Sequence, residues 1–168
     1  MGEAGVVAGM VDESLSLDIR RIVTDSDLDG VVTGAILRRW WPEAEVVFGH
    51  PGELRAGLLD DCMDRHTAVC DLPRHPKCGL SIDHHQSNAP TEHDDDGVVV
   101  VWRQAPSAAR IAYDLLAANT DLSDLADMLV WVDKLDGGGI TREEFRSNHP
   151  VVWLGRLIDV ESGLALHI

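Results

Sequence analysis

Residues 19–30 read IRRIVTDSDLDG, and this stretch decides the fold. Its first part, Ile19–Thr24, is rich in β-branched residues and predicts a short strand. The strand runs directly into an acidic turn that ends at Gly30. Apolar residues then recur at helical spacing, so we expect a helix over Val31–Trp41 that Pro42 brings to an end.

The rest of the chain continues this alternation of strands and helices. Further strands are predicted at Glu45–Phe48, Thr67–Cys70, Gly79–Ile82 and Gly97–Trp102. A helix is predicted to follow Pro51 and to end at Leu59. Two more are predicted to start after the capping residues Ser107 and Asp121, and the second of these ends near Lys134. The last two predicted helices cover Thr141–Arg146 and Val151–Ile158. We therefore expect an α/β fold: a mostly parallel sheet of about five strands with helices on both faces.

Length and composition indicate one soluble domain. A chain of 168 residues can bury a core without disulfide support, and no Gly- or Pro-rich linker divides it. We expect a loose leader over residues 1–17 and a single domain over residues 18–168. The three cysteines lack paired spacing, so they indicate neither a disulfide framework nor a zinc ribbon. Without a membrane-span or secretory pattern, we expect a cytoplasmic protein with no membrane partner.

The formal net charge is −15, from 14 basic and 29 acidic residues. Proteins that bind duplex DNA neutralise its phosphates with clustered lysines and arginines, so we do not expect duplex DNA as a partner. Simple solubility accounts for most of the acidic excess. The remaining carboxylates are available to hold divalent cations.

Acidic or histidine side chains follow three of the predicted strands. They are Asp25, Asp27 and Asp29 after the first strand, Asp71 after the third, and Asp83, His84 and His85 after the fourth. Parallel strands bring their carboxyl ends to one edge of the sheet. Carboxylates crowded there repel one another unless cations neutralise them, and carboxylate oxygens with imidazoles suit Mn²⁺ or Mg²⁺. The sequence therefore predicts a metal cluster at this edge.

The acidic turn has two other interpretations. A calcium-binding loop would need a bidentate glutamate at its twelfth position, which, counted from Asp25, is the apolar Ile36. A turn that only caps the following helix would use one aspartate, or two. Asp71 taken alone would be an ordinary residue at a strand end, and it gains meaning only from its neighbours.

This ordered set of motifs resembles the DHH phosphoesterase superfamily, which is named for the tripeptide present here as residues 83–85. The first motif resembles Asp25–Gly30, the second Asp71, and the fourth Trp131–Asp136. The stretch Ala105–Arg110 also resembles the helix start that follows the third motif in relatives. The resemblance extends from Ile19 to Asp159 and implies a DHH-type catalytic domain.

The resemblance also implies a role for each motif residue. The metal ligands would be Asp25, Asp27, Asp29, Asp71, His84 and Asp133, and Asp71 would bridge two ions. In the fourth motif we choose Asp133 over Asp136 because it lies at the predicted helix end. Asp83 would orient His84, while His85 would contact the phosphate. We expect two Mn²⁺ ions as cofactors, with Mg²⁺ as the alternative.

The implied activity is that of a metal-dependent phosphoesterase. It would hydrolyse phosphodiester or phosphoanhydride bonds by a two-metal mechanism. The expected substrate is a small nucleotide, another small phosphate compound or a short single-stranded oligonucleotide. The alternatives are a non-catalytic DHH-like scaffold or binding module, which the complete set of motif residues disfavours, and a nucleotide sensor that binds without hydrolysis.

The chain departs from the family pattern in one respect. Relatives usually carry a second, C-terminal domain with a glycine-rich, histidine-containing motif that closes over the substrate, and nothing after Asp159 resembles it. The sequence is therefore expected to be either a piece of a longer protein or a minimal domain that acts with a partner domain or as a homo-oligomer.

Overall fold

A computed structural model describes residues 13–91 and 97–158. Its strands are β1 (Arg21–Asp25), β2 (Glu45–Gly49), β3 (Thr67–Cys70), β4 (Leu80–Asp83) and β5 (Val99–Trp102). They form one sheet in the order β2-β1-β3-β4-β5, and every neighbouring pair is parallel. The expected parallel sheet of five strands is therefore confirmed.

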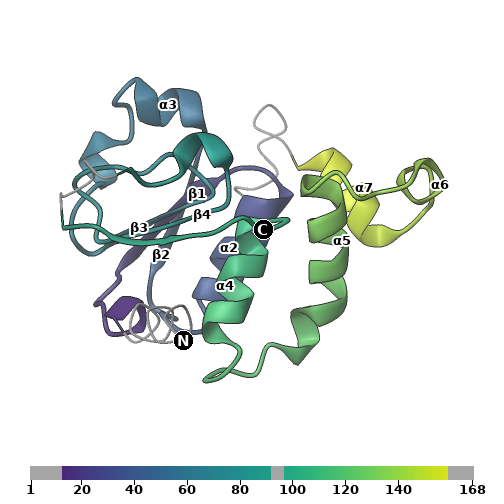
Figure 1. Cartoon of the computed structure of the whole chain (residues 1–168), viewed down its shortest axis with the longest axis horizontal. Helices are drawn as coiled ribbons and strands as arrows, with labels where there is room; N and C mark the ends of the chain where they lie inside the picture. Colours follow the sequence, from purple (N-terminus) through teal and green to yellow (C-terminus); the bar gives the residue numbers. More distant parts are fainter. Residues whose placement is uncertain (1–12, 92–96, 159–168) are drawn as a thin grey trace.

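Helices and short 3₁₀ turns connect the strands. They are α2 (Leu28–Leu37), α3 (Pro51–Arg55), η1 (Asp60–Cys62), η2 (Gln86–Asn88), α4 (Ala108–Leu116), η3 (Ser123–Leu125), α5 (Ala126–Asp136), α6 (Arg142–Phe145) and α7 (Pro150–Leu157). In Figure 1, α2 and α4 lie beside the sheet, α5 lies next to them, and α6 and α7 lie farthest out. α3 lies on the other side of the sheet.

Both faces of the sheet are buried, as a parallel sheet requires. Successive side chains of a strand point to opposite faces. Ile22 of β1 accordingly packs with residues of α2, α4 and α5 in the larger core, while Val23 packs with Leu54 of α3 and Met63 in a smaller one. The expectation of helices on both faces is confirmed, with the thicker layer on the side of α2 and α4.

The first helix begins earlier than its apolar pattern predicts. Asp27 has an extended backbone, and its side chain accepts a hydrogen bond from the Gly30 amide, which makes Asp27 the N-cap. Consequently α2 starts at Leu28 rather than Val31, with its first turn formed by the end of the acidic turn, and it ends at Leu37 rather than at the expected Trp41. Because the first turn of a helix often contains polar residues, apolar spacing alone places the helix start too late.

Two other helices differ from the expected boundaries. The helix expected to reach Leu59 ends at Arg55, since Gly57 adopts a positive φ of 74° that stops the helix. Asp121 caps a turn by accepting a bond from the Ser123 amide, and α5 starts only at Ala126. That helix continues past Lys134 to Asp136.

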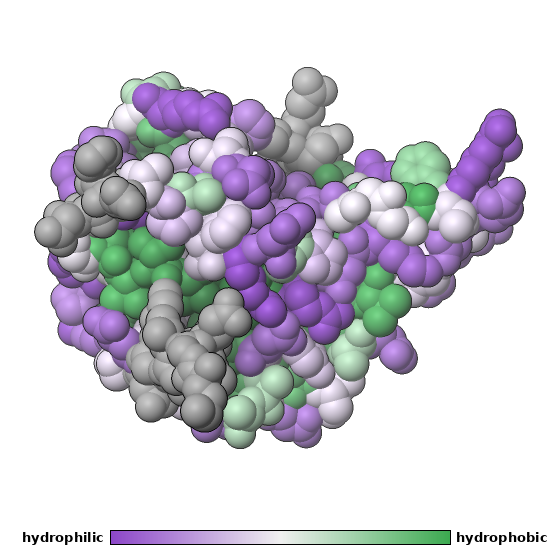
Figure 2. Space-filling view, viewed as in Figure 1, coloured by the Kyte–Doolittle hydropathy of each residue, from purple (hydrophilic) through white to green (hydrophobic). Residues whose placement is uncertain are grey.

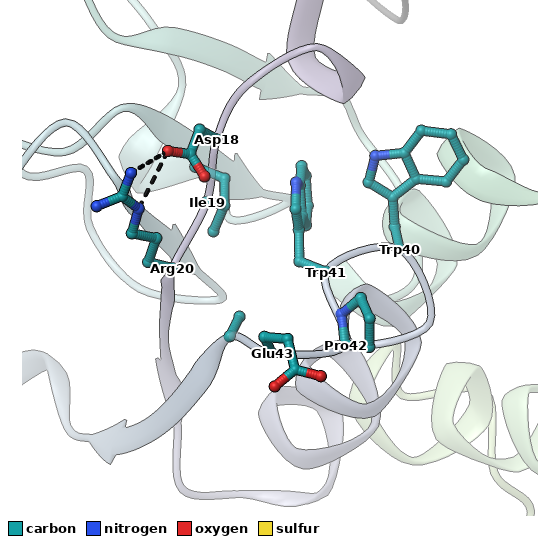
Figure 3. Close-up of a pocket in the computed structure, with 8 residues that line it drawn as sticks. Asp18, Ile19, Arg20, Trp40, Trp41, Pro42 and Glu43 are labelled. Atoms are coloured by element: carbon teal, nitrogen blue, oxygen red, sulfur yellow. Dashed lines mark hydrogen bonds and ion pairs between the residues drawn. The ribbon is translucent and has the colours of Figure 1, made fainter.

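A pocket of about 490 Å³ lies at the amino edge of the sheet (Figure 3). Residues 1–12 of the expected leader lie outside the described residues, but residues 13–17 pass this region. The indole N–H groups of Trp40 and Trp41, which line the pocket, donate to the carbonyls of Leu15 and Leu17, both at 3.0 Å. Arg20 and Asp18 pair with each other at its rim. The pocket's polar groups are thus largely engaged within the protein.

Hydrophilic residues cover most of the face shown in Figure 2, in keeping with the net charge of −15. Within the described ranges, no helix combines the length and the apolar character that crossing a membrane would require.

Replacing Gly30 by alanine tests the close packing of the acidic turn. A Cβ atom at this position would lie 2.1 Å from the carbonyl oxygen of Asp25, so the backbone would have to shift. We expect Gly30→Ala to lower the free energy of unfolding by about 1–3 kcal/mol, the usual effect of overpacking. Urea denaturation measures this change.

Gly34→Ala on the same helix is the matched control. Its Cβ would meet side-chain atoms of Val46 and Thr24 at 3.5 and 3.6 Å, which is ordinary contact. Alanine also favours a helix over glycine by about 0.8–1 kcal/mol, so this variant should be at least as stable as the parent. Equal destabilisation by the two substitutions would contradict the close approach at Gly30.

Candidate metal centre

The register of the sheet places three aspartates at one edge. Thr24 of β1 pairs with Cys70 of β3, and Cys70 pairs with Ile82 of β4. One residue further along these strands lie Asp25, Asp71 and Asp83. Since the strands are parallel, their acidic ends lie together at the carboxyl edge, as the sequence predicts.

Asp71 lies at the centre of this edge in an unusual backbone conformation. Its φ is 55°, in the left-handed region that aspartate tolerates better than most residues. The Asp71 amide donates to the Ile82 carbonyl at 2.9 Å, which holds the backbone there. The residue is 2% exposed, and within the described part of the chain its Oδ1 atom has no hydrogen-bond partner.

The ring of His84 presents its Nε2 atom to this edge. Nδ1 lies 3.1 Å from the Ala105 carbonyl, which can only accept, so Nδ1 carries the proton and Nε2 keeps its lone pair in the neutral ring. Nε2 lies 3.5 Å from Asp71 Oδ1, 3.6 Å from Asp29 Oδ2 and 3.2 Å from Asp136 Oδ2.

The atoms Asp71 Oδ1 and His84 Nε2 fit a bound divalent cation. Both are buried, and neither has a hydrogen-bond partner among the described residues. Buried polar atoms are normally paired, because leaving one unsatisfied costs about 1–3 kcal/mol. Both belong to groups whose ligand atoms lie within 4.8 Å of one another: Asp71, Asp83, His84 and His85 form one group, and Asp29, His84 and Asp136 form the other.

Asp29 reaches the centre from the first turn of α2. Its two carboxylate oxygens accept from the Ala108 and Ala109 amides at 2.7 and 2.8 Å, at the N-terminus of α4. Burial and the nearby charge of Asp136 raise the pKa of Asp29 to about 7, although the two amides act to lower it. The N-terminus of α4 thus stabilises the ionised form of Asp29, whereas burial and Asp136 destabilise it.

Asp25 and Asp27 lie at the beginning of the same turn. Burial and the charge of Asp27 raise the pKa of Asp25 to about 6, and the Ser26 amide donates to it at 2.7 Å. Asp27 uses Oδ1 to cap α2. Together with Asp29 and Asp136 it lines a pocket of about 200 Å³ whose other walls are the apolar residues Leu28, Val132, Leu135 and Gly155.

Asp83 orients the ring of His85, and this corrects the expectation that it orients His84. Asp83 Oδ1 accepts from the two histidine amides and from His85 Nδ1, the last at 2.8 Å. Its Oδ2 accepts from the Asn88 side chain at 2.5 Å. Burial acts against ionisation, but the bonds from His85 and Asn88 prevail and lower the pKa of Asp83. The bond to Asp83 in turn raises the pKa of His85.

The fourth motif contributes Asp136 to the cluster, whereas we had expected Asp133. Asp133 Oδ1 accepts from Ser107 Oγ at 2.7 Å, and its Oδ2 accepts from Arg110 Nε and Nη2 at 2.9 and 2.5 Å. Asp136, one helical turn later, has the short approach to His84. Helix α5 continues to Asp136, so both aspartates lie within it, and the rotation of the helix brings Asp136 rather than Asp133 to the cluster.

Several groups at this site could not be identified from the sequence. The Ala108 and Ala109 amides and the Ala105 carbonyl are main-chain groups that any residue type provides. Asn88 could have been noticed as an amide residue shortly after the tripeptide, but nothing in the sequence pattern predicts its hydrogen bond to Asp83. Asp136 was visible as the alternative in its motif.

The acidic cluster favours bound cations on electrostatic grounds. Burial, followed by the charges of Asp29 and Asp27, raises the pKa of Asp71 well above its ordinary range. Burial also raises the pKa of Asp136, with the nearby histidines opposing it and Asp27 adding to it. Divalent cations would relieve this repulsion and keep the carboxylates ionised.

The comparisons with known proteins agree with this fold. No protein-family model matches the chain, and the curated protein sequences gave no match. A solved structure of the pGpG-specific phosphodiesterase PggH from Vibrio cholerae is similar, with a TM-score of 0.68 and 27% sequence identity. The alignment covers 86% of this chain and 46% of that one, so the chain spans about half the length of PggH. The chain has a DHH-like fold, and the resemblance seen in its motifs is confirmed at this level.

The raised pKa values predict how the stability of the metal-free protein depends on pH. Asp25 and Asp29 hold protons up to about pH 6 and about 7 in the folded state, but only to about pH 4 when unfolded. The folded state binds more protons in between, so the free energy of unfolding should fall as the pH rises through this window. Mn²⁺ should therefore raise the midpoint temperature Tm much more at about pH 8 than at about pH 5.

Thermal denaturation with a chelator or with Mn²⁺ measures this difference. Asp29→Asn should lose most of the gain in Tm at the higher pH. Asp127→Asn is the control, because this exposed residue lies on the same helix as Asp136 but outside the cluster. An equal effect of Mn²⁺ at both pH values would speak against a metal centre at this edge.

Proposed function

We propose that this chain is a metal-dependent phosphodiesterase that acts on small nucleotides. The observation that carries the proposal is a pair of buried atoms at the carboxyl edge of the sheet, Asp71 Oδ1 and His84 Nε2, which have no hydrogen-bond partner among residues 13–91 and 97–158. The similar structure of PggH, a pGpG-specific phosphodiesterase, supports a phosphodiester as the bond that is cut. The same metal-assisted hydrolysis would also cleave a phosphoanhydride bond.

The metal ligands in this proposal are Asp29, Asp71, His84 and Asp136, with Asp25 and Asp27 completing the site. Two ions of Mn²⁺, or of Mg²⁺, suit this set of carboxylate oxygens and one imidazole. When bound, they would lower the pKa of water and neutralise the charge that develops on the phosphate oxygens. Asp71 belongs to one of the two groups of ligands, and its Oδ1 lies 3.5 Å from Nε2 of His84, the residue that both groups share; we assign Asp71 the bridging role that the family resemblance implies.

His85 is the residue placed to contact the phosphate. Its side chain is 47% exposed, and its Nδ1 is committed to Asp83. The ring therefore offers Nε2–H to a substrate oxygen when it is protonated, a state that the Asp83 carboxylate favours. Asn88 and the amides of the two histidines donate to Asp83 and stabilise its carboxylate, and this negative charge in turn stabilises the protonated ring of His85.

Charge and size both favour a small substrate. The chain's net charge of −15 repels a long polyanion unless cations compensate it locally. A dinucleotide or a short single-stranded oligonucleotide brings few phosphates and can be held mainly by the metal ions and His85. The chain spans about half of PggH, so we propose that further substrate contacts come from a partner domain or a second copy.

A hydrolysis panel tests the proposal. The protein is incubated with Mn²⁺ and, separately, with pGpG, a short single-stranded oligonucleotide, pyrophosphate and bis(p-nitrophenyl) phosphate, each with a chelator control. We expect release of mononucleotide from pGpG that the chelator abolishes. Tight Mn²⁺ binding without hydrolysis of any substrate would instead indicate the non-catalytic binding module.

Two substitutions connect that activity to the centre. Asp71→Asn and His84→Ala should lower kcat by more than about 100-fold, beyond the effect typical of residues that only support a ligand. Both proteins should keep the far-ultraviolet circular dichroism of the parent, and Asp127→Asn should keep its activity. Undiminished Mn²⁺-dependent hydrolysis by both variants would refute the assignment.

A further inference from the structure

Three side chains form a hydrogen-bonded cluster between α4 and α5, which lie side by side in Figure 1. Ser107 Oγ donates to Asp133 Oδ1 at 2.7 Å and accepts from the Arg110 amide at 3.0 Å. Arg110 donates through Nε and Nη2 to Asp133 Oδ2 at 2.9 and 2.5 Å. We call these three residues the α4–α5 clamp.

The clamp is well shielded from solvent. Ser107 is fully buried, and the side chains of Asp133 and Arg110 are 17% and 28% exposed. Both guanidinium bonds converge on one oxygen, Asp133 Oδ2, while Ser107 occupies Oδ1, and such charge-assisted bonds are among the stronger polar contacts in proteins. The clamp therefore fixes the rotation of α5 as well as its distance from α4.

Each side of the clamp leads directly to a proposed metal ligand. On α4, Ser107 precedes Ala108 and Ala109, whose amides hold the Asp29 carboxylate. On α5, Asp136 follows Asp133 by one helical turn, and its Oδ2 lies 3.2 Å from His84 Nε2. One cluster thus sets the relative position of two ligands that come from different helices.

Helix α5 is also held by the core, by the Lys134–Glu144 ion pair with α6 and by stacking of Trp131 on His149, but the clamp is its polar side-chain contact with α4. Its N-cap, Leu125, provides no side-chain hydrogen bond, and Leu129 and Val132 are its only fully buried side chains. The C-terminal end of α5 lies close against the loop before α4. A Cβ atom added at Gly137 would lie only 3.1 Å from the Pro106 carbonyl oxygen. A rotation of α5 that broke the clamp would change the 3.2 Å approach of Asp136 Oδ2 to His84 Nε2.

We propose that Asp133 is a positioning residue, held by Ser107 and Arg110, which places Asp136 in the metal centre. This inference rests on the proposed function and names residues that act through a ligand rather than on the substrate. Asp133 is unsuited to be a ligand itself, since both of its oxygens are engaged in the clamp.

Removing the guanidinium tests the clamp. Arg110→Met keeps the length and the apolar stem of the side chain but leaves Asp133 without its two charged bonds. We expect the Kd for Mn²⁺ to rise by at least about tenfold, the lower end of the range for residues that support a ligand. Titration of the full chain with Mn²⁺, followed by electron paramagnetic resonance, measures the Kd and the signal of the bound ion.

Arg103→Met is the matched control. Arg103 also pairs with an aspartate, Asp114, and both side chains are about half exposed (48% and 45%). This pair touches Arg110 from the solvent side of α4, through Asp114 Oδ1 at 4.0 Å and the Arg110 carbonyl at 3.5 Å, but it makes no contact with Asp133. This variant should bind Mn²⁺ within about twofold of the parent, as expected for a surface ion pair. A loss as large as that of Arg110→Met would mean that any arginine near α4 has this effect, and the clamp would be rejected.

A double-mutant cycle separates the positioning role from direct ligation. Asp133→Asn should weaken Mn²⁺ binding in the parent but add less than about a further twofold in the Arg110→Met background, because both changes break one unit. Full additivity of the two losses would show that Asp133 binds the metal independently, which would overturn the proposal.

Two further variants complete the design. Arg110→Lys keeps the charge but not the paired bonds, so its Kd should lie between those of the parent and Arg110→Met even if the methionine variant folds poorly. Asp136→Asn should lose Mn²⁺ binding in any case. If Asp136→Asn does so while both Arg110 variants bind Mn²⁺ as the parent does, the clamp is rejected and the proposed function stands. If Asp136→Asn also binds and hydrolyses normally, the metal centre itself is misplaced.

Discussion

The parallel register of β1, β3 and β4 is the constraint on which the site depends. Thr24, Cys70 and Ile82 lie in one row across these strands, so the residues that follow them reach the carboxyl edge at the same level. A shift of one strand by a single residue would turn its buried side chains to the opposite face and withdraw its aspartate from the edge. The two cores that cover the sheet therefore also fix the geometry of the site.

Several kinds of contact offset the electrostatic repulsion among the aspartates near this edge. Asp29 is held by the amides of α4, Asp83 by donors around its own turn, and Asp133 by Arg110. Asp71 Oδ1 and the neighbouring His84 Nε2, by contrast, have no hydrogen-bond partner in the described part of the chain. The contrast between the paired and the unpaired groups is what distinguishes the candidate metal position from an ordinary acidic surface.

The sequence predicts the sheet well because its strands are short apolar runs that end in polar residues. Asp25, Asp71 and Asp83 could be placed at one edge from this pattern alone. We chose Asp133 over Asp136 from the sequence, but both lie on the same helical segment, and the rotation of α5 decides which of them reaches the cluster. That rotation is set by Ser107 and Arg110, which are 26 and 23 residues away in the sequence. The support of Asp29 by main-chain amides some 80 residues away has no sequence signal.

The outermost strand β5 has a consequence for how the protein behaves at high concentration. Its four residues, Val99–Trp102, are all apolar and all partly exposed, and within the described ranges no strand pairs with its outer side. Such an edge is a template for pairing with another chain. The net charge of −15 keeps molecules apart in dilute buffer. Salt screens that repulsion over a distance of about 10 Å at 0.1 M, so colloidal stability depends on ionic strength as much as on the fold.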